Sequence, residues 1–184
     1  MNKEINRSGY KDNRIKLKIA ISWVLVIAWA YVIFYLSSRT APESTVQSQT
    51  VISSFAWLFG KVITDPDTMI KIDGIVRETA HGVEYFILGA LVYNAIFVCL
   101  NYRRQEEKLL TAETGIECGD KFRQINSGVC SILVCTLYAL SDEIHQIPIP
   151  GRTFQILDLV IDATGVIIGV AITAIIKKIV YKNI

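Results

Sequence analysis

Ten ionisable or amide side chains form three clusters along this chain of 184 residues, and their spacing suits a binding or catalytic site. In the first cluster Arg77, His81 and Glu84 are separated by four and three residues, and Tyr85 follows directly. At about 100° per residue this spacing places the first three on one face of a helix. The arginine could bind a phosphate or carboxylate through paired N–H donors. The histidine and the glutamate could instead exchange protons with a substrate.

The second cluster contains Asp142, Glu143 and Gln146, and a turn with two prolines and a glycine separates it from Arg152. Helical spacing places Asp142 and His145 on one stripe with Gln146 adjacent, and it turns Glu143 about a quarter turn away. Because the prolines fix the backbone and the glycine permits a tight turn, we expect the turn to hold the guanidinium over the same region.

The third cluster consists of Asp158 and Asp162, whose helical stripe continues through Gly165 and Gly169. Two small residues four apart allow close approach of helices in lipid. The contact could lie within the chain or at a dimer seam. We favour the contact within the chain, because the same stripe carries two aspartates that need an interior.

Metal and disulfide chemistry have little support in the sequence. The two histidines stand in different segments, and no pair of cysteines has the CxxC spacing of a zinc site. Three cysteines lie in apolar stretches and only Cys118 lies in a polar loop, so no disulfide is expected. We predict neither a metal nor another cofactor.

Long apolar segments must position the three clusters. Hydrophobic residues make up 52% of the chain and charged residues 20%, whereas soluble domains carry about 25% charged residues. We expect an all-α integral membrane bundle of four transmembrane helices, because a helix of about 20 residues crosses the ~30 Å hydrocarbon layer. The expected spans are 19–36, 80–100, 125–147 and 157–176, within a single domain over 19–176 that has basic tails at 1–18 and 177–184.

The positions of lysine and arginine predict the orientation of the chain. The N-terminal tail holds six, the loop 101–124 five and the C-terminal tail three, which makes 14 on one side against five on the other. The positive-inside rule therefore places both termini in the cytoplasm. The first apolar run is longer than that of a signal peptide and lacks a small-residue cleavage site, so we expect it to remain as the first span.

The loop between the first two spans contains an apolar stripe. Apolar residues recur at helical spacing, whereas Ser48, Ser54 and Lys61 fall off the stripe. This pattern predicts an amphipathic helix in the outer membrane interface, or alternatively a helix packed over the ends of the spans. We expect Asp65, Pro66 and Asp67 to end that helix. The stripe consists of Val51, Ile52, Phe55, Leu58, Phe59 and Val62.

With this topology the three clusters fall at the same outer end of three helices. Charges at membrane depth are costly, so they face the bundle or a wet cavity and are usually paired. A network of ion pairs that only locks the helix ends is one interpretation. We favour a site, because three helices do not need polar faces aimed at one spot to be stable. The candidate residues are Arg77, His81, Glu84, Tyr85, Asp142, Glu143, Gln146, Arg152, Asp158 and Asp162.

Several short motifs, in this order, resemble the VanZ-like family over about residues 35–169. They are Arg77-x-x-x-His81-x-x-Glu84-Tyr85-x-x-Leu88-Gly89, Asp142-Glu143-x-x-Gln146, Pro150-Gly151-Arg152 and Asp158-x-x-x-Asp162-x-x-Gly165-x-x-x-Gly169, and Ser37-Ser38 after the first span fits as well. The family more often has lysine where Arg77 stands and often asparagine where Asp162 stands. The resemblance implies a bacterial plasma-membrane protein and, for the member after which the family is named, a part in resistance to teicoplanin.

Three mechanisms fit these residues. In the first, Arg77 and Arg152 bind an anion at the outer leaflet while Gln146 adds donors. In the second, an enzyme acts on a lipid-linked or cell-wall substrate with His81 or Glu143 as general base, although no GxSxG nucleophile motif is present. The third is a transporter or a structural partner of another membrane protein. We rank binding first. Expected partners are the lipid bilayer and an anionic lipid headgroup, a lipid-linked cell-wall precursor or a glycopeptide; nothing indicates nucleic acid binding.

Overall fold

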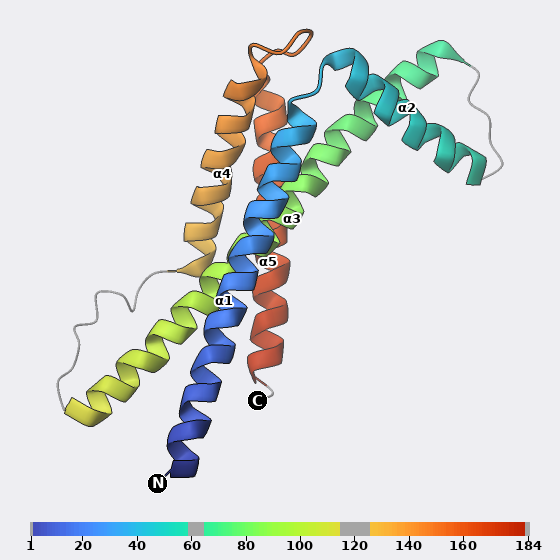
Figure 1. Ribbon diagram of the computed structural model, residues 1–184. Coiled ribbons are helices and arrows are strands. Elements are labelled where there is room, and N and C mark those ends of the chain that lie inside the picture. Colours follow the sequence, from blue (N-terminus) through green and yellow to red (C-terminus); the bar gives the residue numbers. More distant parts are fainter. Residues whose placement is uncertain (1, 59–64, 115–125, 183–184) are drawn as a thin grey trace.

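The computed structural model describes residues 2–58, 65–114 and 126–182, and these residues form helices joined by short connections. Four long helices make an elongated bundle, and a fifth, α2, lies at one end of it (Figure 1). Both chain termini lie at the opposite end (Figure 1). The predicted all-α class and its four candidate membrane-spanning helices are confirmed. The helices are α1 (Asn2–Ser37), α2 (Ala41–Leu58), α3 (Pro66–Thr114), α4 (Ser127–Gln146) and α5 (Ile156–Lys182).

The helices are longer than the spans expected from hydropathy. Helix α3 has 49 residues, which corresponds to about 74 Å at 1.5 Å per residue and exceeds the ~30 Å hydrocarbon layer. Helix α1 likewise continues through most of the basic tail predicted at 1–18. A helix does not have to end where the lipid ends, so hydropathy marks only the apolar part of each helix.

The sequence explains where α3 begins. Asp65 precedes the helix, and its Oδ2 accepts a hydrogen bond from the Thr68 backbone N–H at 2.9 Å. Pro66 occupies the first helical position, where its missing N–H leaves no bond unmade. Asp65 itself lies outside the helices, so the expected break at this position is present. The predicted stripe residues Phe59 and Val62, as well as Lys61, lie outside the described residues.

Glycines bring α3 and α5 into close contact. A Cβ atom on Gly89 would lie 2.7 Å from the backbone oxygen of Val166, and one on Gly165 or Gly169 would overlap the backbone of α3 at Gly82 or Phe86. The expected contact of the Gly165 and Gly169 stripe within the chain is therefore present. It sets the distance between the helices that carry the first and third polar clusters.

A narrow core lies between α1, α3, α4 and α5. Tyr85, Val92, Cys135 and Val166 are buried there. Many large aliphatic and aromatic side chains on the outside are exposed, for example Ile27, which is 67% exposed. This distribution suits a bundle whose outer surface contacts lipid instead of water.

Helix α2 packs against α3 and against no other described helix. The contact buries Ile52 and Ser48, and the Ser48 hydroxyl donates to Asp73 of α3. This arrangement differs from the predicted stripe, because Ser48 was expected on the polar face and Val51, expected on the apolar one, is 46% exposed. The hydrogen bond to Asp73 explains why a serine is buried there. The location of α2 at the membrane interface stays a prediction.

Candidate functional site

The polar clusters gather at the α2 end of the bundle (Figure 1). Helices α1 and α4 end there, α5 begins there, and α3 enters the bundle there. His81 of α3 interacts electrostatically with Asp158, Arg152 and Asp142. Glu84, one turn further along α3, interacts with Asp142 and Arg152. The structure thus brings the three clusters of the sequence together in space.

A chain of hydrogen bonds links α1, α4 and the following turn. The Ser37 hydroxyl donates to Asp142 Oδ2 at 2.7 Å, and Gln146 Nε2 donates to the same oxygen at 3.2 Å. Arg152 Nη1 in turn donates to Gln146 Oε1 at 3.4 Å. Ser37, Asp142 and Gln146 are each at most 4% exposed, so these hydrogen bonds are buried and support the guanidinium of Arg152.

The turn after α4 places Arg152 over the bundle end. Gly151 has a φ of 78°, a conformation that side chains with a Cβ rarely adopt. The Arg152 backbone N–H donates to Ile149 O at 3.0 Å, and the Ile149 N–H donates to Gln146 O at the same distance. Two consecutive turns therefore fold the chain back, as the prolines and the glycine predict.

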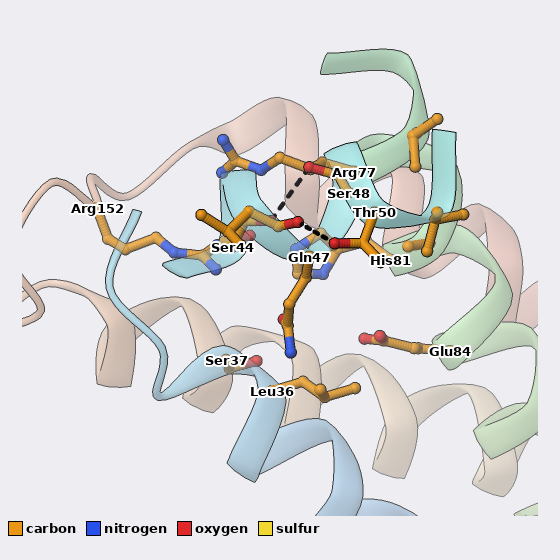
Figure 2. A pocket seen from close by; sticks show the side chains of 14 residues that line it. Leu36, Ser37, Ser44, Gln47, Ser48, Thr50, Arg77, His81, Glu84 and Arg152 are labelled. Atoms are coloured by element: carbon orange, nitrogen blue, oxygen red, sulfur yellow. Dashed lines mark hydrogen bonds between the residues drawn. The ribbon is translucent and has the colours of Figure 1, made fainter. Parts of the chain in front are cut away.

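A pocket of about 530 Å³ lies between the end of α1, α2, the first part of α3 and Arg152. Arg152 enters from one side, and Arg77 of α3 reaches toward that same side (Figure 2). Glu84 points into the pocket from α3, and Gln47 extends from α2 toward Ser37 (Figure 2). The pocket thus combines two guanidinium groups with a carboxylate, an imidazole, hydroxyls and an amide. It is lined by Leu36, Ser37, Ser44, Val46, Gln47, Ser48, Thr50, Val51, Val76, Arg77, Ala80, His81, Glu84 and Arg152.

The two guanidinium groups influence each other without close acidic partners. Burial and the charge of Arg77 lower the pKa of Arg152, while the charges of Asp142, Asp158 and Glu143 oppose this shift. An arginine nevertheless stays protonated in proteins. Among the described residues, neither Arg77 nor Arg152 has a carboxylate oxygen within 4 Å, and the Arg152 Nε is buried without a hydrogen-bond partner. The predicted network of paired charges is therefore incomplete at its cationic side.

Six candidate residues do not line the pocket: the hydrogen-bonded Asp142 and Gln146, Asp158 of α5, and the buried Tyr85, Glu143 and Asp162. Tyr85 and Asp162 are at most 1% exposed, and the Tyr85 hydroxyl and one Asp162 oxygen have no partner among the described residues. Glu143 is 1% exposed, and its Oε2 accepts the Gln155 backbone N–H at 3.0 Å. Glu143 therefore supports the chain just before the start of α5, and it does not line the pocket.

The candidate Asp158 and the histidine His145, which helical spacing placed on the stripe of Asp142, have local roles. Asp158 is half-buried in the first turn of α5, where a helix N-terminus favours negative charge. His145 stacks on Phe34 of α1 with ring centroids 4.4 Å apart, and its Nε2 lies 3.2 Å from the Ser38 hydroxyl. Its stripe with Asp142 was expected, but the imidazole contacts α1 and does not line the pocket.

Some residues of the site were not singled out from the sequence. Gln47 and Ser44 line the pocket from α2. Trp29 of α1 donates its indole N–H to the Glu84 backbone oxygen at 2.9 Å and so ties α1 to α3 beside the pocket. Nothing in the sequence around a tryptophan in an apolar run indicates which backbone oxygen its indole N–H will bind. The polar residues of α2 could have been noticed, since Ser44, Gln47 and Ser48 share one helical face.

The comparisons with known proteins identify the family of the chain. No curated protein and no solved structure matches the chain significantly. The model of the VanZ/LLP1 family matches residues 22–177, a segment that contains every residue of the polar cluster and extends beyond the resemblance seen at 35–169. Since this match covers most of the chain, and four helices are long and apolar enough to cross a membrane, the chain is a multi-pass membrane protein that belongs to the VanZ-like family.

Proposed function

We propose that the pocket binds an anionic component of the cell envelope and holds its phosphate or headgroup between Arg77 and Arg152. The observation that carries this proposal is the pair of guanidinium groups on one pocket, neither with a carboxylate oxygen within 4 Å among the described residues. Like charges in a medium of low dielectric repel each other, and this repulsion decreases when an anion binds between them. A buried, unpartnered Nε on Arg152 leaves a donor for that anion.

The surrounding groups suit the recognition of a phosphate. Arginine presents donors in a planar fork that matches a phosphate oxygen pair, and hydrogen bonds to charged groups contribute about 1.5–3 kcal/mol each. Gln47 and Ser44 offer neutral donors from α2. Glu84 and Asp142 limit the net positive charge of the pocket, so a ligand with one phosphate group fits better than a polyanion.

The family membership supports a wider setting for this binding. We propose a location in a bacterial plasma membrane, with both termini in the cytoplasm and the pocket at the outer surface, on the basis of the 14 to five distribution of basic residues. There the pocket would meet headgroups and cell-wall precursors. Binding of such a component could change the susceptibility of the cell to teicoplanin-type glycopeptides.

The test is a binding measurement on the purified protein in detergent. Phosphate should raise the melting temperature relative to chloride at equal ionic strength, because a ligand that binds the folded state stabilises it. Arg152→Lys keeps the charge and loses the planar fork, so we expect about tenfold weaker phosphate binding with little change in melting temperature without phosphate. Arg103→Lys, an exposed change outside the pocket, is the matched control.

The same variants separate binding from a structural role of Arg152. If Arg152 only stabilises the fold, through its hydrogen bond to Gln146 and its electrostatic attraction to the acidic residues nearby, Arg152→Ala lowers the melting temperature and loses function in proportion. A stably folded Arg152→Ala that retains the full phosphate response would rule out the anion site. Cells that express the variants at matched levels then report teicoplanin susceptibility.

An enzymatic function is the second candidate, and one observation favours it. His81 lines the pocket beside both guanidinium groups, and its Nδ1 is buried with no hydrogen-bond partner among the described residues. An imidazole next to a bound phosphate could transfer a proton. His81→Gln should abolish turnover of a lipid-linked phosphate in this case, whereas simple binding should survive the change.

A further inference from the structure

The pocket is larger and more apolar than a bare phosphate requires. Its volume of about 530 Å³ falls in the range of sites for whole small molecules, ~300–1,000 Å³. Five aliphatic side chains contribute to its wall together with the polar groups described above. They are Leu36, Val46, Val51, Val76 and Ala80.

The pocket also lies at the ends of the membrane-spanning helices. Glu84 lines it, and the Glu84 backbone lies beside Trp29, to which it is hydrogen-bonded. On α1 the pocket is lined by Leu36 and Ser37, in the last turn, and on α3 by Ala80, His81 and Glu84, at the start of the expected span 80–100. A ligand in this pocket therefore lies at the end of the apolar part of the spans.

On one side of the pocket there is a seam between the end of α1 and α2, which no helix packing closes. The end of α1 and the helix α2 both line the pocket, yet the two helices do not pack against each other. On α2, Val46 is 64% exposed and Val51 is 46% exposed. Aliphatic side chains on the wall of a polar pocket favour a ligand that covers them, because burial of apolar surface is favourable.

We propose that the ligand is a membrane amphiphile with a phosphate headgroup and an acyl or prenyl chain. This rests on the proposed function, in which Arg77 and Arg152 hold the phosphate. The acyl or prenyl chain of the ligand leaves through the seam between α1 and α2, along Leu36, Val46 and Val51, and continues into the bilayer. The amphiphile enters sideways from the membrane and does not need to leave it.

The test compares dodecyl phosphate, inorganic phosphate and, as an uncharged reference, dodecanol, with the protein in neutral phosphatidylcholine nanodiscs. Radiolabelled dodecyl phosphate is measured as retention above empty discs, which subtracts its partition into the bilayer, and inorganic phosphate is measured by the shift in melting temperature. The double variant Val46→Thr, Val51→Thr keeps the side-chain shape and adds hydroxyls to the wall. Val83→Thr is the control, because Val83 is 50% exposed on α3 and does not line the pocket.

We expect the double variant to weaken dodecyl phosphate about tenfold and to change the response to inorganic phosphate less than about twofold. Val83→Thr should match the wild type for both probes, and Arg152→Lys should weaken both. Wild-type retention of dodecyl phosphate by the double variant would overturn the amphiphile and leave a pocket for water-soluble anions. If neither probe binds, or if dodecanol binds as tightly as dodecyl phosphate, the anion site itself is wrong and the proposed function falls with it.

Discussion

The close contact between α3 and α5 gives a sharp prediction for Gly89. A Cβ atom at this position would lie 2.7 Å from the Val166 oxygen and 3.0 Å from its Cα, whereas ordinary contacts begin at 3.4 Å. The atoms that it meets belong to the backbone and cannot rotate away. Gly89→Ala must therefore move the helices apart by several tenths of an ångström at the point where they position the pocket.

The magnitude follows from a comparison within the same helix. Gly74 also lies in α3, and a Cβ there would meet nothing within 4 Å. Both substitutions gain the same helix propensity, ~1 kcal/mol, so their difference isolates the steric effect. Overpacking costs about 1–3 kcal/mol, and a backbone clash belongs in the upper half of this range. For a chain of this size the melting temperatures should differ by roughly 4–12 °C.

The assay is thermal unfolding of both variants in one detergent, followed by the phosphate response described above. Gly74→Ala should melt at or above the wild-type temperature. Gly89→Ala should melt lower and should bind phosphate less tightly. A larger distance between α3 and α5 displaces the helix that carries Arg77 from the turn that carries Arg152. Equal melting temperatures of the two variants would refute the close packing of α3 and α5.

Three further predictions concern the support of the site and the topology. Gln146→Met removes the acceptor that orients the guanidinium of Arg152, and it should weaken phosphate binding about three- to tenfold. Unchanged binding would show that this hydrogen bond does not position Arg152. Ser48→Ala removes the donor to Asp73, so spin-label distances between α2 and α3 should broaden, and an unchanged distribution would contradict the anchoring role. Single cysteines at Glu106 or Lys178, in a variant without the native cysteines, should react with an impermeant maleimide only after cells are permeabilised. Labelling of intact cells would reverse the proposed orientation.

The sequence alone was sufficient for the fold class and for the end of the bundle at which the polar groups meet. Lipid offers the backbone no hydrogen bonds, so long apolar segments have to be helices. Successive spans run in opposite directions, so residues at the end of one span and the start of the next share a side. Arg77, Asp142 and Asp158 follow from this alternation without any knowledge of packing.

Only the tertiary structure decided which of these groups line a pocket. Glu143 and His145 lie within one turn of Asp142, yet Glu143 accepts a backbone N–H at the start of α5 and His145 stacks on α1. The role of α2 as a pocket wall also depends on the hydrogen bond between Ser48 and Asp73, residues far apart in the sequence. Periodicity gives the relative angles of side chains on one helix. It contains no information on how far that helix is rotated toward its neighbours, because rotation depends on which surfaces pack closest, here the glycine contacts of α3 and α5.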